Sequence, residues 1–266
     1  MGDQRASYEV QAITRAATIL ELIELGNGES SLSELTSRTG LRKPTVYRLV
    51  RNLERIGLAE RVPGTSRYRL GLRCVELGQA YLEQVSFREE AMPVLRQLRD
   101  TCNEAVHLAV LDDRLRVIYL EKLESTHAIG IMMSAVGRSA PAYCTALGKA
   151  LLAARGDDPA GVLAARGELE AKTTNTICDV ESLRAELELT RERGYALDLE
   201  EHELGVRCVG TAIVGPDGAA VAALSIAGLA QRLPKSLLVG DLARASMQAA
   251  REISRHLGAA DPRSER

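Results

Sequence analysis

Residues 31–57 read SLSELTSRTGLRKPTVYRLVRNLERIG and contain two short amphipathic segments separated by Gly40. The first begins at Ser31, and Glu34 follows three residues later. This is the capping-box pattern, in which each of the two side chains accepts a hydrogen bond from the other residue's backbone N–H at the start of a helix. The pattern predicts a short helix that begins at Ser31 and ends near Gly40.

The second segment predicts a longer helix with one apolar face. Pro44 suits its first turn, because a backbone N–H at that position would have no partner inside the helix. Gly57 marks its end. Apolar residues recur at helical spacing at Val46, Leu49, Val50, Leu53 and Ile56. Two short helices joined by a tight turn are typical of a helix-turn-helix.

The flanking residues complete a winged version of this motif. Apolar residues at helical spacing predict a further helix over residues 9–25. Residues 59–62 and 67–70 predict two strands joined by Pro63-Gly64-Thr65-Ser66, a turn of the kind that closes a hairpin. We therefore predict a winged helix-turn-helix domain over residues 9–70.

The charge of this region differs from that of the whole chain. The protein has a formal net charge of −2, yet the stretch from Arg38 to Arg73 holds ten Arg or Lys residues and only two acidic ones. A local basic block in a mildly acidic protein indicates one module that faces a polyanion. We expect that partner to be double-stranded DNA.

The polar arc of the second helix carries the expected DNA contacts. Arg and Asn can pair with guanine and adenine edges in the major groove. Residues near the start of such a helix usually enter deepest, so Thr45, Tyr47 and Arg48 are expected at base edges and Arg51 and Arg55 at phosphates. The full predicted set is Arg42, Lys43, Thr45, Tyr47, Arg48, Arg51, Asn52, Arg55, and, on the wing, Arg67 and Arg69.

The rest of the chain alternates between helix and strand patterns. Residues 71–86 predict a linker helix, and residues 87–258 predict an α+β domain with an antiparallel sheet. The expected strands are 105–111, 116–123, 129–134, 195–199, 207–214 and 220–227, and the expected helices are 142–154, 179–193 and 234–257. The closing helix and the first helix each carry an apolar face, which we consider as a dimer contact.

The composition indicates where in the cell the protein is expected. No run of 18 apolar residues occurs, and the polar start of the chain argues against a signal peptide, so we expect a cytoplasmic protein. The five cysteines are widely spaced and form no paired motif, which predicts buried reduced thiols. We expect no metal site and no cofactor.

Several stretches resemble the IclR family of bacterial transcriptional regulators. In the first domain these are residues 40–49 (GLRKPTVYRL) and 68–71 (YRLG). In the second they are residues 145–153 (TALGKALLA), 194–198 (GYALD) with Glu201, 205–209 (GVRCV) and 223–228 (ALSIAG). The resemblance covers nearly the whole chain.

The resemblance implies a GAF/profilin-like effector domain that binds a small metabolite, often an organic acid or an aromatic catabolite. It implies a dimer or tetramer that binds a palindromic operator, with repression as the commoner mode. The effector-binding positions that it implies are Ala146, Leu147, Asp198, Val206, Cys208 and Ser225, with Ile129, Met132 and Ala140 in an apolar wall.

The sequence departs from the family pattern at two of these places. Members that bind glyoxylate or pyruvate tend to have a second serine where this chain has Ala227, and a small residue where it has Leu147. Loss of a hydroxyl removes a hydrogen-bond donor for a carboxylate, which disfavours a very small oxo-acid. At the start of the recognition helix the family's Pro-Lys-Ser/Thr-Thr is replaced by Arg42-Lys43-Pro44-Thr45.

Two other classes of protein remain as alternatives. One is a constitutive DNA-binding regulator whose second domain only oligomerises. The other is an enzyme with an appended DNA-binding domain, although the chain has no GxSxG, HExxH or glycine-rich phosphate loop, and we assign no catalytic residue. The polar run from Glu200 to Glu203 could serve as an acid, a base or a metal ligand, but we expect a solvated loop.

Overall fold

The computed structural model describes residues 10–26, 28–125, 127 and 134–259. The chain divides into two compact units, residues 1–84 and 85–266. The expected fold class is confirmed: a winged helix-turn-helix is followed by an α/β domain with an antiparallel sheet.

The first unit contains four helices and a small sheet among its described residues. Its order is α1 (Gln11–Leu25), β1 (Ser30–Ser31), α2 (Leu32–Thr39), α3 (Lys43–Arg55), β2 (Ala59–Arg61), β3 (Arg67–Leu70) and α4 (Arg73–Gln84). The predicted capping box at Ser31 and Glu34 is present, and Gly40 ends α2 in the left-handed conformation, at φ 67°. The antiparallel strands follow the order β1-β3-β2.

The core of this unit lies where α1, α2 and α3 pack against one another. Its buried residues include Ile19, Leu35, Val46 and Val50. Gly71 allows the end of the wing to pack closely against the end of α3. A Cβ at this position would lie only 2.1 Å from the Gly57 carbonyl oxygen. A side chain there would force the backbone of the wing apart.

The second unit is built on a six-stranded antiparallel sheet in the order β6-β5-β4-β9-β8-β7. The strands are β4 (Ala105–Leu111), β5 (Arg116–Leu123), β6 (Ser139–Pro141), β7 (Ala196–Leu199), β8 (Val206–Val214) and β9 (Ala220–Leu229). The helices are α5 (Ser86–Cys102), α6 (Ala146–Ala153), α7 (Pro159–Ala165), α8 (Val180–Arg193), α9 (Lys235–Leu237) and α10 (Ala243–His256), with a π-helical turn at Leu238–Leu242 before α10.

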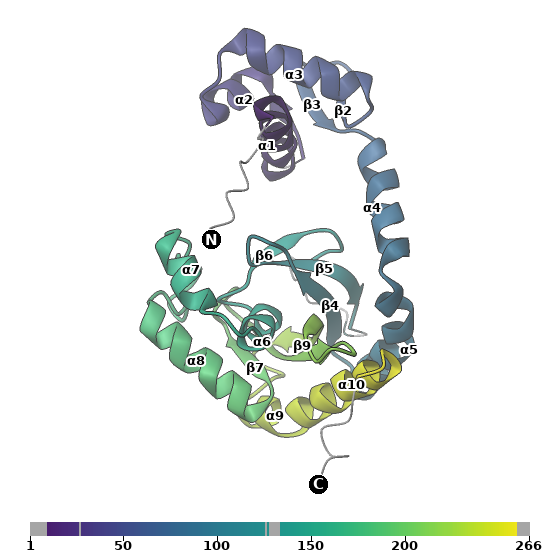
Figure 1. Ribbon diagram of the computed structural model, residues 1–266, viewed down its shortest axis with the longest axis vertical. Helices are drawn as coiled ribbons and strands as arrows, with labels where there is room; N and C mark the ends of the chain where they lie inside the picture. The colour runs from purple at the N-terminus through teal and green to yellow at the C-terminus, as the bar shows by residue number, and fades with distance from the viewer. Residues whose placement is uncertain (1–9, 27, 126, 128–133, 260–266) are drawn as a thin grey trace, which may run out of the picture. The chain divides into compact units, whose positions relative to one another are not determined.

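Helices cover both faces of this sheet. Figure 1 shows α5 and α10 side by side, and their apolar residues form one core cluster with Leu108, Val209 and Leu224 of the sheet. Helices α6, α7 and α8 pack on the opposite face in a second cluster. The two clusters make the sheet the middle layer of a three-layer domain.

Helix α6 is seated unusually close to the sheet. A Cβ at Gly210 of β8 would lie 2.7 Å from the backbone carbonyl of Ala146, and a Cβ at Gly148 would lie 2.2 Å from Cα of Ala142. Both distances are shorter than any normal packing contact. Glycine at these two positions therefore lets the first turn of α6 lie directly on the strand.

Three expectations for the second unit are corrected. Helix α5 was not predicted, although Ala91, Val94 and Leu98 lie at helical spacing and are buried. The expected helix over 142–154 begins only at Ala146, where Thr145 caps it. The apolar face of the closing helix is buried within its own domain, so it does not offer a dimer contact.

Two further expectations concern particular parts of the chain. The strand expected over 129–134 lies outside the described residues except for Ser134, which is not in a strand. Within the described ranges, no helix combines the length and the apolar character needed to span a membrane.

The seating of α6 generates a stability prediction. Gly210→Ala should lower the free energy of unfolding by about 1–3 kcal/mol, because the new methyl group collides with backbone rather than with a side chain that can move. Urea unfolding measures this change. Gly240→Ala is the matched control, because nothing lies within 4 Å of a Cβ there. Equal stability of the two variants would show that α6 is not tightly seated.

Candidate functional sites

The first candidate site is the exposed face of α3. Its buried residues Val46, Val50 and Leu53 point into the unit's core, so the opposite arc faces solvent. Tyr47 and Arg48 lie on this arc, and Tyr47 is 49% exposed. Arg48 makes no ion pair with any residue that the structure describes. Its guanidinium is therefore available to a ligand.

Other polar residues of α3 interact within the helix. Arg51 pairs with Glu54 at 2.6 Å, and Arg55 donates a hydrogen bond to Asn52 Oδ1. The Asn52 amide in turn donates to the Arg48 carbonyl at 2.8 Å. All of these groups are exposed, where such pairs contribute little stability and are readily exchanged for a ligand.

The two wing arginines each form an ion pair within the first unit. Arg67 donates to both Glu34 carboxylate oxygens and to the Glu29 carbonyl, so it ties β3 to the start of α2. Arg69 pairs with Glu60 across the hairpin. Arg67 thus has a structural role that the sequence did not reveal, because its partners lie more than 30 residues away.

The second candidate site is a cavity of about 40 Å³ between the sheet and the start of α6. The pairing register brings its sheet residues into two neighbouring rows. Asp198 lies opposite Cys208, which lies opposite Ala227, and in the next row His107 lies opposite Ser225. Ala146 and Leu147 cover these rows from the first turn of α6. The cavity is partly open to solvent, so its mouth adds room beyond this volume.

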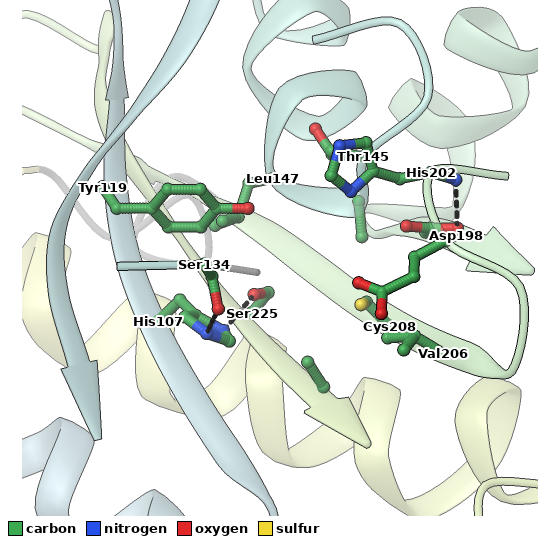
Figure 2. Close-up of a pocket in the computed structure, with 13 residues that line it drawn as sticks. His107, Tyr119, Ser134, Thr145, Leu147, Asp198, His202, Val206, Cys208 and Ser225 are labelled. Atoms are coloured by element: carbon green, nitrogen blue, oxygen red, sulfur yellow. Dashed lines mark hydrogen bonds between the residues drawn. The ribbon is translucent and has the colours of Figure 1, made fainter. Parts of the chain in front are cut away.

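Asp198 is a buried titratable group at one end of the cavity, beside His202 (Figure 2). It is 3% exposed, and burial raises its pKa to about 7. Its Oδ1 atom accepts a hydrogen bond from the Glu201 N–H at 2.8 Å. Burial also raises the pKa of the neighbouring Cys208 thiol, which is therefore protonated. Asp198 thus changes charge near neutral pH in a confined space.

The opposite end of the cavity is polar but uncharged. His107 Nε2 lies 2.9 Å from Ser134 Oγ, and Nδ1 lies 3.5 Å from Ser225 Oγ. Burial, with a smaller effect of Lys122, lowers the pKa of His107 to about 3, so the ring is neutral. Tyr119 contacts this ring edge-on, with the ring centres 5.5 Å apart.

A buried ion pair supports the wall of the cavity. Lys149 of α6 is 1% exposed, and its Nζ contacts Glu201 Oε1 at 2.5 Å and Glu186 Oε1 at 3.7 Å. Glu201 Oε2 is buried and accepts no hydrogen bond from the described residues. Thr173 and Thr176 donate to the carbonyls of Glu200 and Glu201, so the loop after β7 is fixed from both sides.

This loop corrects the expectation for residues 200–203. Glu201 is buried, and His202 and Glu203 line the cavity, so the run is not a solvated loop. No cluster of three or more metal-ligating side chains occurs among the described residues. The cysteines are free, as expected, but Cys178 is exposed and only Cys144 is fully buried.

Comparison with known proteins identifies the chain. The model described as "Bacterial transcriptional regulator IclR C-terminal" matches residues 79–255, and the "IclR helix-turn-helix domain" matches residues 12–63. The chain belongs to the IclR family. It is 33% identical to the HTH-type transcriptional regulator XynR of Escherichia coli K12, over 94% of this chain and 98% of the relative. It is 30% identical to the transcriptional repressor IclR of the same organism, over 94% and 90%.

A solved IclR homologue from Microbacterium hydrocarbonoxydans shares the fold. Its TM-score is 0.75 at 24% identity, over 92% of this chain and 98% of that one, and its structure holds 4-hydroxybenzoate. The protein is therefore a DNA-binding transcriptional regulator of the IclR family, with the helix-turn-helix in its first unit.

The structure brings most of the expected effector-binding residues of this IclR-family protein together. Asp198, Val206, Cys208, Ser225, Ala146 and Leu147 all line the cavity. Ala140 does not: it lies in β6 opposite Val117 and is buried in the core beneath α6. Ile129 and Met132 lie outside the described residues.

Sequence reasoning missed several residues that line the cavity. His107, Tyr119, Ser134 and Thr145 were not selected, nor were His202 and Glu203. One signal was present: His107 interrupts the apolar strand AVHLAVL, where alternation places it on the same face as Ala105 and Ala109. Tyr119 lies on the next strand, and only the observed register shows that its ring contacts that of His107.

The buried ion pair gives a second prediction. Lys149→Met should destabilise the protein by about 3–5 kcal/mol, because it leaves the Glu201 carboxylate buried without a partner. Adding Glu201→Gln should recover part of this loss by removing the charge. Thermal and urea unfolding measure both effects. Lys172→Met is the matched control, since Lys172 forms only an exposed pair with Glu170. A change in Lys149→Met no larger than in the control would contradict the buried pair.

Proposed function

We propose that this IclR-family protein represses a metabolic operon, binds its operator as a homodimer, and responds to a small organic acid bound in the cavity of the second unit. The observation that carries the proposal is the coexistence of two separate sites. One is an exposed cationic helix face, and the other is a partly open cavity lined by residues from five strands and a helix start. We infer that it acts in the cytoplasm, where bacterial DNA lies.

The DNA contacts of this proposal follow the accessibility of the α3 side chains. Thr45, Tyr47 and Arg48 are the base-edge readers, because they occupy the open arc near the helix start. Arg51, Asn52, Arg55, Arg42 and Lys43 are the surrounding contacts, together with Arg69 on the wing. Arg67 stabilises the domain itself, through its ion pairs with Glu29 and Glu34.

An exposed apolar surface on α4 supports a dimer. None of the residues of α4 is buried, and Val75 and Tyr81 are more than half exposed. Leu72, directly before the helix, is 75% exposed. Large apolar side chains grouped in this way mark a surface that a partner covers. A second copy of the chain is the partner that a two-fold operator requires.

The start of α6 supports an acid as the effector. The backbone N–H groups of Ala146 and Leu147 lie at the first two positions of the helix and donate to no described residue. They line the cavity, and a helix N-terminus favours an anion. No Lys or Arg side chain lines the described part of the cavity. A carboxylate there requires Asp198 to be protonated.

A pH dependence of effector binding follows. Because the pKa of Asp198 is raised to about 7, the residue is protonated below that pH and charged above it. A bound carboxylate favours the protonated form, so its Kd should rise by up to about tenfold per pH unit above pH 7. Thermal-shift screening of monocarboxylic acids followed by calorimetry from pH 6 to 8.5 measures this. Asp198→Asn should remove the dependence, and tighter binding at higher pH would contradict an acid effector.

DNA binding gives a separate prediction. Arg48→Ala should weaken binding to an operator fragment by about 1–3 kcal/mol, because it removes a base-edge contact. Arg55→Ala should instead flatten the log–log salt dependence by about 0.9. Electrophoretic mobility shift and light scattering measure affinity and whether two chains bind each operator. Arg244→Ala, an exposed arginine of α10, is the control. Unchanged binding of Arg48→Ala would refute the role of α3.

A further inference from the structure

The two polar ends of the cavity differ in charge. Figure 2 shows Asp198 and His202 at one end and His107, Ser134 and Ser225 at the other. The first end holds the carboxyl group that titrates near neutral pH and adjoins the start of α6. Among the described residues, the second holds hydroxyls and a neutral imidazole. A ligand that spans the cavity meets a different chemistry at each end.

The Tyr119 side chain borders the uncharged end of the cavity. The residue is 7% exposed, and its Oη atom makes no hydrogen bond to any described residue. Its side chain points into the cavity beside Leu147 (Figure 2). Burial raises the pKa of this phenol, so it keeps its proton. A hydroxyl that borders the cavity and has no partner among the described residues is a donor and acceptor available to a ligand.

The groups at the uncharged end of the cavity favour a neutral ligand group. The His107 ring is held between Ser134 and Ser225, and the Tyr119 hydroxyl lies beside it. These groups can both donate to and accept from a ligand hydroxyl. A second carboxylate would be buried without a cation, because no Lys or Arg side chain lines the described part of the cavity. Such burial costs far more than the hydrogen bonds return.

We propose that Tyr119, with the His107–Ser134–Ser225 group, is a specificity subsite that reads a hydroxyl at the far end of the effector. The effector is then a hydroxy-substituted monocarboxylic acid, with its carboxylate at the start of α6. This proposal rests on the proposed function, since it takes the carboxylate end as given. It adds that the far end prefers a hydroxyl to hydrogen and excludes a second carboxylate.

Two matched series of probes test the subsite on the full-length protein. The aliphatic series is propionate, 3-hydroxypropionate and malonate, and the aromatic series is benzoate, 4-hydroxybenzoate and terephthalate. In the series whose length fits, the hydroxy acid should bind at least about tenfold tighter than the parent acid, the effect of one buried hydrogen bond. The diacid should bind more weakly than the hydroxy acid by at least the same factor. Calorimetry measures each Kd.

Tyr119→Phe separates recognition from folding. It should reduce the preference for the hydroxy acid by about tenfold and leave the Kd of the parent acid unchanged. Tyr143→Phe is the matched control, because Tyr143 is equally buried but donates to the Glu170 carbonyl outside the cavity. The control should leave the preference intact.

The outcomes distinguish the two proposals. If no acid of either series binds wild type, the acid effector of the proposed function fails, and the subsite fails with it. If parent acid and hydroxy acid bind equally, or the diacid binds best, the subsite is overturned while the acid effector stands. A preference that survives Tyr119→Phe would likewise overturn the role of Tyr119.

Discussion

The close seating of α6 on the sheet is the constraint on which the second domain depends. Gly210 has no side chain, so the Ala146 backbone can rest on β8 at a distance that any Cβ would forbid. Gly148 does the same against Ala142. This contact brings the N–H groups of the helix start, which donate to no described residue, over a sheet row that ends in Asp198. Without it, the carboxyl group and the helix start would face solvent separately.

Burial of charge follows from the same seating. Lys149 of α6 is buried, and Glu201 of the loop after β7 and Glu186 of α8 neutralise it. The pair fixes the loop after β7, and that loop contributes His202 and Glu203 to the cavity. Burial of this kind is costly unless each charge has a partner, so the geometry of the cavity and the stability of the domain are linked.

The cations of the first domain divide into two groups by what surrounds them. Arg67 is engaged by Glu29 and Glu34 and holds the wing against α2, while Arg48 has no charged partner among the described residues. Both arginines belong to one basic stretch of the sequence, so their charge alone does not show that their roles differ. The division matters for mechanism, because a cation already paired inside the domain must lose that pair before it can meet a phosphate.

Local patterns in the sequence determined the winged helix-turn-helix, the family and five strands of the second domain, namely β4, β5, β7, β8 and β9. Capping, helical periodicity and turn chemistry act over a few residues, so the box at Ser31, the stripe of α3 and the strand at Ala105–Leu111 could all be predicted. Helix α5 carried the same periodicity and was overlooked. Only the tertiary structure decided the partners of Arg67, the burial of Glu201 with Lys149, and the meeting of His107 with Tyr119. These depend on strand register and on contacts between residues far apart in the chain, which no local pattern encodes.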